Sequence, residues 1–115
     1  MYFIRREILG YIMKKEEVLN YLKLHKKRME DEYHIEKIGL FGSYAKDKEH
    51  FSSDIDLILK FKNDYITSCD PWDYFNTLSH IKNDVTSQFL LHVDIVDEQS
   101  DSPYLAQIQK EAIYV

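Results

Sequence analysis

Apolar positions along this chain follow two periods, and the helical period comes first. The charged segment from Lys14 to about Asp31 carries its apolar residues on one stripe, which is typical of an amphipathic helix. That stripe consists of Val18, Leu22, His25 and Met29. We therefore predict a helix with one face in the core and a solvated opposite face.

Three shorter segments alternate between apolar and polar residues, which is the period of a half-buried strand. They cover residues 37–41, 54–61 and 91–96. In the second segment, one face is predicted to carry Ile55, Leu57, Leu59 and Phe61, and the other Asp54, Asp56 and Ile58. In the third, Asp94 shares its face with His92, opposite Val93 and Ile95.

Helix signals fall between these strands. Asp70 can cap a helix that starts at Pro71, with Asp73 near the positive end of its dipole. Trp72, Phe75, Leu78 and Ile81 follow at helical spacing and are expected in the core or on a partner surface. A short helix is predicted at "SYAKD", and a last one opens at Ser102 and Pro103. The order of elements indicates an α+β domain with a small sheet covered by helices.

Composition narrows the class of protein. The 115 residues are enough for one domain, which we place at residues 14–115, with residues 1–13 as an N-terminal extension. A net charge of −5 argues against direct binding to nucleic acid. Cys69 is the only cysteine, and neither a signal peptide nor a membrane-spanning stretch is recognisable, so we expect a reduced, cytoplasmic protein without membrane contact.

The Gly42-Ser43 step is the first candidate for chemistry. A strand that turns into a helix through these residues leaves backbone N–H groups unpaired, and such donors attract phosphate. Glycine permits close approach of a ligand, and serine adds a hydroxyl donor. A simple turn is the more common meaning of this dipeptide when it stands alone.

Three aspartates form the second candidate. Asp54 and Asp56 lie two apart on a strand, so their side chains share a face and repel each other unless a cation lies between them. Asp94 could join them from a neighbouring strand, and three such carboxylates can hold two Mg²⁺ ions. Each alone also fits a solvated strand face. Asp97 is a rival ligand, for which a capping or loop role is favoured.

Together these motifs resemble those of the polymerase-β-like nucleotidyltransferases. The segments "LFGSYAKDKEHFSSDIDLILKF", "VDIV" and "EAIYV" are most similar to the minimal nucleotidyltransferases, the MNT antitoxins that pair with HEPN toxins. The resemblance covers nearly all of residues 14–115 and implies a polymerase-β palm-like fold, a small mixed sheet flanked by helices. It also implies an enzyme that transfers AMP from ATP to a tyrosine of a HEPN toxin and thereby silences it.

The same resemblance assigns roles to individual residues. Gly42 and Ser43 would contact the β- and γ-phosphates of ATP, and Asp56 would bridge two Mg²⁺ ions that Asp54 also ligates. Asp94 would bind the catalytic ion and help to deprotonate the acceptor hydroxyl. Ser53 could contact the nucleotide or cap its loop, with capping slightly favoured.

Two residues depart from the family pattern GS-x-A-R-G. Lys46 replaces the arginine and keeps its charge without the forked geometry, and Asp47 replaces the permissive glycine. We expect the metal site to survive these changes and nucleotide affinity to be the property at risk. Two alternatives stay open: an antitoxin that acts by contact alone, and a nucleotidyltransferase acting on a small-molecule hydroxyl. In every version this small domain is expected to need a partner subunit or a homodimer.

Overall fold

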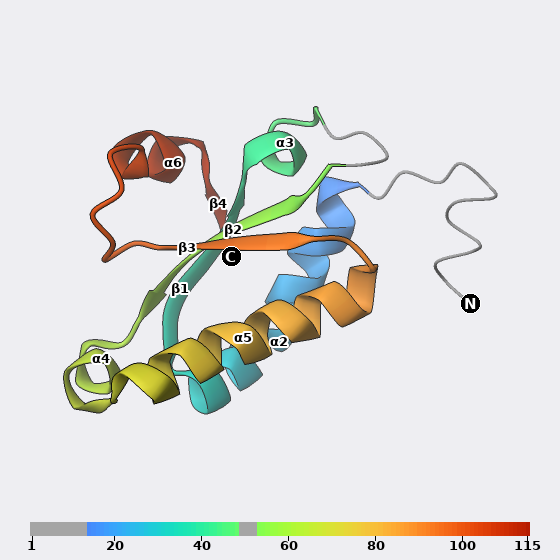
Figure 1. Ribbon diagram of the computed structural model, residues 1–115. Coiled ribbons are helices and arrows are strands. Elements are labelled where there is room, and N and C mark those ends of the chain that lie inside the picture. The colour runs from blue at the N-terminus through green and yellow to red at the C-terminus, as the bar shows by residue number, and fades with distance from the viewer. Residues whose placement is uncertain (1–13, 49–52) are drawn as a thin grey trace.

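A four-stranded mixed sheet forms the centre of the fold, in the strand order β3-β2-β1-β4 (Figure 1). The computed structural model describes residues 14–48 and 53–115. Its strands are β1 (Ile35–Phe41), β2 (Ile55–Phe61), β3 (Val93–Asp97) and β4 (Ile113–Tyr114). Strand β1 pairs antiparallel with β2 and β4, whereas β2 and β3 run parallel. The predicted α+β class with a small mixed sheet is confirmed.

Helices lie on both sides of this sheet (Figure 1). They are α2 (Lys15–Tyr33), α3 (Gly42–Ala45), α4 (Asn63–Ser68), α5 (Pro71–Phe89) and α6 (Leu105–Glu111). The long helices α2 and α5 cover one face, and α3 and α6 lie on the other side. Parallel strands need a long crossover, which α4 and α5 supply between β2 and β3. Among the described residues, no helix combines the length and apolarity needed to cross a membrane.

The core lies between the sheet and the two long helices. The predicted inward face of β2 is fully buried, as are the predicted helix residues Val18, Leu22 and Met29. Ile58 is buried too, although it belongs to the opposite face of β2. Burial of each such side chain contributes about 1.5–3 kcal/mol. This packing fixes β2 rigidly and with it the side chains that β2 presents on its other face.

The predicted start of α5 is confirmed in detail. The Asp70 side chain accepts a hydrogen bond of 2.8 Å from the backbone N–H of Asp73, and Pro71 occupies the first turn. The helix ends at Phe89, and its C-cap residue Leu90 adopts a left-handed conformation with φ 57°. The start is therefore set locally, as the sequence signals indicate, whereas the sequence analysis made no prediction for the end.

The core interpretation of Trp72 and Phe75 is wrong. Their side chains are 77% and 61% exposed, whereas Ile81 is fully buried. The reason is geometric: each step of three residues rotates by about 60° around a helix with 3.6 residues per turn, so the three steps between Trp72 and Ile81 add up to about 180° and leave the buried face. The buried side of α5 instead follows Ile81 and Val85. Exposure on a partner surface stays a prediction for Trp72 and Phe75.

Two described elements have no counterpart in the sequence-based prediction, helix α4 and strand β4. In β4, Tyr114 pairs with Gly39, and the backbone N–H of Val115 donates to the carbonyl of Ile38 at 3.1 Å. A strand of two residues is too short to show a period. The apolar C-terminal residues therefore extend the sheet beyond β1.

Candidate active site

Strand β2 presents Asp54 and Asp56 on the face of the sheet opposite to the long helices. Asp54 directly precedes the strand and is exposed, whereas Asp56 lies inside it and is partly buried. Their neighbours Ile55 and Leu57 point into the core. The alternation of the strand thus separates two carboxylates from the apolar side chains between them, as predicted.

Strand β3 brings Asp94 to the same place. Because β2 and β3 are parallel neighbours, Asp56 and Asp94 are direct partners in the register. The backbone N–H of Ile55 donates to the carbonyl of His92 at 2.9 Å and aligns the beginnings of the two strands. The pairing places all three predicted carboxylates on one small area of the sheet.

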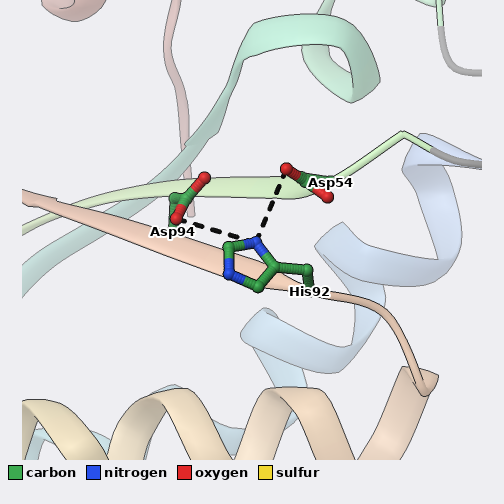
Figure 2. Close-up of side chains that lie close together, drawn as sticks. All are labelled: Asp54, His92 and Asp94. Atoms are coloured by element: carbon green, nitrogen blue, oxygen red, sulfur yellow. Dashed lines mark ion pairs between the residues drawn. The ribbon is translucent and has the colours of Figure 1, made fainter.

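The His92 imidazole lies between two of these carboxylates (Figure 2). Its Nδ1 atom is 3.5 Å from Oδ2 of Asp54 and 3.7 Å from Oδ1 of Asp94. One ligand atom from each of the three side chains lies within 4.8 Å of the others. This spacing is close enough for Asp54 and Asp94 to share a cation. His92, which the sequence placed on the same strand face as Asp94, lies within the cluster itself.

The electrostatics of Asp56 reflect this crowding of negative charge. Burial, together with the charges of Asp94 and Asp54, raises the pKa of its carboxyl to about 6, against a smaller opposing effect of His92. Burial and the two neighbouring carboxylates thus disfavour the ionised form. A bound cation would offset them, and carboxylate oxygens are the hard ligands that Mg²⁺ prefers. The donor set therefore fits Mg²⁺.

Gly42 lies directly against Asp56. It adopts φ 76°, and a Cβ atom at this position would be 2.2 Å from Oδ2 of Asp56. Glycine is thus required twice, for a left-handed backbone and for a close approach. Ser43 follows in α3, whose Tyr44 side chain is buried and holds the short helix to the sheet. The predicted phosphate turn and the predicted metal ligands are in contact.

Lys46 and Asp47 follow this turn, and both have ion-pair partners. Nζ of Lys46 lies 2.9 Å from Oε1 of Glu111 in α6, and this contact lowers the pKa of Glu111. Asp47 has φ 56°, so it adopts the left-handed conformation for which glycine is suited, and its carboxylate pairs with Lys15 at 2.8 Å. Aspartate tolerates this conformation better than most residues.

The remaining predicted residues lie at the edges of the site. Ser53 is only 5% exposed and directly precedes Asp54. Residues 49–52 of the loop that it was expected to cap lie outside the described residues. Asp97 is not a ligand candidate: it accepts hydrogen bonds from the backbone N–H of Gln99 at 2.9 Å and from the hydroxyl of Tyr74 in α5 at 2.5 Å. Its predicted loop role is confirmed.

Sequence reasoning missed Glu111 and Lys15 as neighbours of the turn. Both are polar residues on helices far away in the chain, and no local motif links them to residues 46 and 47. Only the packing of α6 and α2 near the turn brings them there. A signal for such pairs does not exist in one sequence.

Comparison with known sequences gives a family match over nearly the whole chain. A family model described as polymerase beta, nucleotidyltransferase, matches residues 12–115. A Methanocaldococcus jannaschii protein named "Putative protein adenylyltransferase MJ0128" is 30% identical over 102 residues, which cover 86% of this chain and 95% of that protein.

Solved structures with a similar fold have 21–24% sequence identity to this chain. A structure described as a putative minimal nucleotidyltransferase matches with a TM-score of 0.65 over 88% of this chain and 95% of that one. A structure of a toxin-antitoxin with AMP-PNP matches with a TM-score of 0.57 over 89% of this chain and 72% of that one. A structure of a tri-AMPylated Shewanella oneidensis HEPN toxin in complex with an MNT antitoxin matches with a TM-score of 0.51 over 84% of this chain and 68% of that one. At this identity the likeness shows the fold.

Proposed function

The chain belongs to the polymerase β-type nucleotidyltransferase family, and we propose that it is a protein adenylyltransferase that acts as an antitoxin. In this proposal it transfers AMP from ATP to a tyrosine hydroxyl of a HEPN-type toxin and neutralises that toxin. The name of the M. jannaschii relative supports the reaction. The AMPylated toxin and the AMP-PNP complex among similar folds support the partner and the nucleotide.

One observation carries the proposal: Asp54, Asp56 and Asp94 share one face of the sheet, with Gly42 packed against Asp56. Phosphoryl and nucleotidyl transfer need little covalent chemistry from a protein, because positioning and charge stabilisation supply most of the rate. A triphosphate next to the Gly42-Ser43 turn would place its negative charge beside the carboxylates. Only a cation between the triphosphate and the carboxylates can make this placement of like charges favourable.

In the proposed reaction, the residues of this site have separate roles. Asp54 and Asp94 would hold Mg²⁺, with Asp56 as the shared ligand of two ions, and backbone N–H groups of the turn would bind the β- and γ-phosphates. Asp94 would accept the proton of the attacking tyrosine hydroxyl. The oxygen forms a bond to the α-phosphorus of ATP, the bond to the β-phosphate oxygen breaks, and pyrophosphate leaves. Mg²⁺, when bound, neutralises the triphosphate and polarises the α-phosphate.

One observation favours an alternative in which the protein neutralises its partner by contact alone. Lys46, the counterpart of the family arginine, is paired with Glu111. A lysine engaged in this way contributes less to nucleotide binding than a free arginine fork. Weak nucleotide binding would leave an antitoxin whose effect depends on complex formation. A cytoplasmic location remains part of the proposal in both versions.

The test uses the protein, ATP, Mg²⁺ and, as the candidate partner, the product of the neighbouring gene. We expect the mass of that partner to increase by one or more AMP units. The double variant Asp54→Asn/Asp56→Asn should abolish the increase, whereas Asp101→Asn, which removes a single carboxylate charge at an exposed loop position, should not. Neutralisation that persists in the double variant without modification would support contact alone. Transfer of AMP to a small-molecule hydroxyl instead would overturn the proposal that the substrate is a protein.

A further inference from the structure

The position of His92 has a consequence for the cation that this site binds. Its imidazole comes from the residue just before β3, and its two carboxylate neighbours come from β2 and β3. All three side chains are exposed. An exposed cluster can adjust its side chains without disturbing the core. From the arrangement in Figure 2, the three side chains can therefore reach a shared metal ion through small movements.

The distances between the three side chains are longer than hydrogen bonds and close to those between ligands of one metal ion. At 3.5 and 3.7 Å, Nδ1 is too far from the Asp54 and Asp94 oxygens for a normal hydrogen bond. Ligand atoms around one ion with bonds of about 2.1 Å lie roughly 3.0–4.2 Å apart, depending on the angle between them. The three donors, all within 4.8 Å of one another, need to close by only a small amount.

The mixed donor set differs from an all-oxygen Mg²⁺ site. Imidazole nitrogen suits Zn²⁺, Cu²⁺, Ni²⁺ and iron, whereas carboxylates and water suit Mg²⁺ and Mn²⁺. A nitrogen ligand raises affinity for transition ions in the order of the Irving–Williams series and adds little for Mg²⁺. Two carboxylates and one imidazole are also a combination found in protein zinc sites.

We propose that His92, Asp54 and Asp94 bind a transition-metal ion such as Mn²⁺ or Zn²⁺, with Nδ1 of His92 as a direct ligand. This inference rests on the proposed function for its relevance, because the same carboxylates would hold Mg²⁺ during AMP transfer. His92 is then the residue that determines cation selectivity: Mn²⁺ can replace Mg²⁺, and Zn²⁺ competes with it for the site. Metal binding itself does not depend on AMP transfer and can be measured without it.

The test uses the untagged, metal-free protein. After loading with Mn²⁺, pulsed electron paramagnetic resonance should show nitrogen modulation from a directly bound imidazole. His92→Gln, which keeps a polar side chain of similar size, should remove the modulation. His80→Ala, which removes an exposed histidine of α5, should retain it. By calorimetry, His92→Gln should weaken Zn²⁺ binding about tenfold or more and change Mg²⁺ binding by less than about twofold.

The inference is overturned if the wild-type protein shows no nitrogen modulation, or if His80→Ala loses it as well. It is also overturned if His92→Gln and His92→Ala both leave the ratio of Zn²⁺ to Mg²⁺ affinity unchanged, which would mean a site of carboxylates alone. These outcomes are separable from those of the proposed function. Nitrogen modulation without AMP transfer would support the proposed metal site and contradict the proposed enzymatic function. AMP transfer without nitrogen modulation would support the enzymatic function and contradict His92 as a metal ligand.

Discussion

Gly42 and Asp56 are in direct contact: a Cβ atom on Gly42 would lie 2.2 Å from Oδ2 of Asp56. The Gly42-Ser43 turn and the carboxylate of Asp56 are thereby fixed relative to each other. Since Phe41, the residue before the turn, is the register partner of Asp56 across β1 and β2, the sheet itself holds this contact. A substitution at either residue must affect the other.

Gly42→Ala should therefore abolish AMP transfer and destabilise the fold. The left-handed φ of 76° costs alanine about 1 kcal/mol, and the clash with the carboxylate adds to this cost. Urea denaturation measures the change in free energy of unfolding. In Gly42→Ala/Asp56→Ala the clash with the carboxylate is gone, and the backbone cost and a close contact of 3.2 Å with Cβ of residue 56 remain, so the double variant should be more stable than the sum of the single changes predicts. Strict additivity would contradict the contact.

Asp56→Asn should stabilise the metal-free protein near neutral pH while it abolishes AMP transfer. The raised pKa of about 6 means that the folded protein binds more protons than the unfolded chain between pH 4 and 6. The penalty of the ionised carboxylate is therefore absent below about pH 4 and complete above about pH 7. Because water still reaches Asp56, we expect a gain of only about 1 kcal/mol.

Thermal unfolding in chelator at several pH values measures this effect. The gain from Asp56→Asn should be absent below about pH 4, grow as pH rises from there, and level off above about pH 7. Asp101→Asn serves as the control for a change in net charge and should show no such profile. A gain that grows towards acid pH would have the wrong sign and would contradict the assigned cause.

Glu111→Gln should increase the affinity for ATP. Its carboxylate pairs with Lys46 at 2.9 Å, so removing its charge frees the ammonium group for the phosphates. We expect KM for ATP to fall by about two- to fivefold with kcat nearly unchanged. Lys46→Ala should raise KM. An unchanged KM in both variants would show that Lys46 does not contact the nucleotide.

Asp47→Gly should leave both activity and stability nearly unchanged. Glycine relieves the left-handed φ of 56° but loses the ion pair with Lys15, and these effects are small and opposite. Asp47→Val neither suits the left-handed conformation nor keeps the ion pair. It should lower the free energy of unfolding, measured by urea denaturation, by about 1–2 kcal/mol. Equal loss in both variants would mean that the ion pair rather than the backbone conformation decides stability at this turn.

The sequence predicted the site better than it predicted the surroundings of the site. Alternation in β2 was sufficient to put Asp54 and Asp56 on one face, because a strand has a period of two regardless of its neighbours. That Asp94 pairs with Asp56 depends on a parallel register, which no periodicity specifies. The nearness of His92 to Asp94 follows from their spacing of two residues, whereas its nearness to Asp54 depends on that register.

Other features depend on packing between distant segments. The exposure of Trp72 results from the way α5 rotates against the sheet, and the pairing of Lys46 with Glu111 from the position of α6. Both involve contacts between elements that are separated by long stretches of chain. Local patterns carry no information on them, whereas capping at Asp70 is local and was predicted correctly.

The most direct measurement of the central claim is the rate of AMP transfer to the partner protein by Asp94→Asn, compared with wild type in the same complex. If the carboxylates of β2 and β3 form one catalytic site, the variant should still form the complex and its rate should fall at least about a hundredfold. A rate close to that of wild type, with the partner bound equally well, would contradict the account.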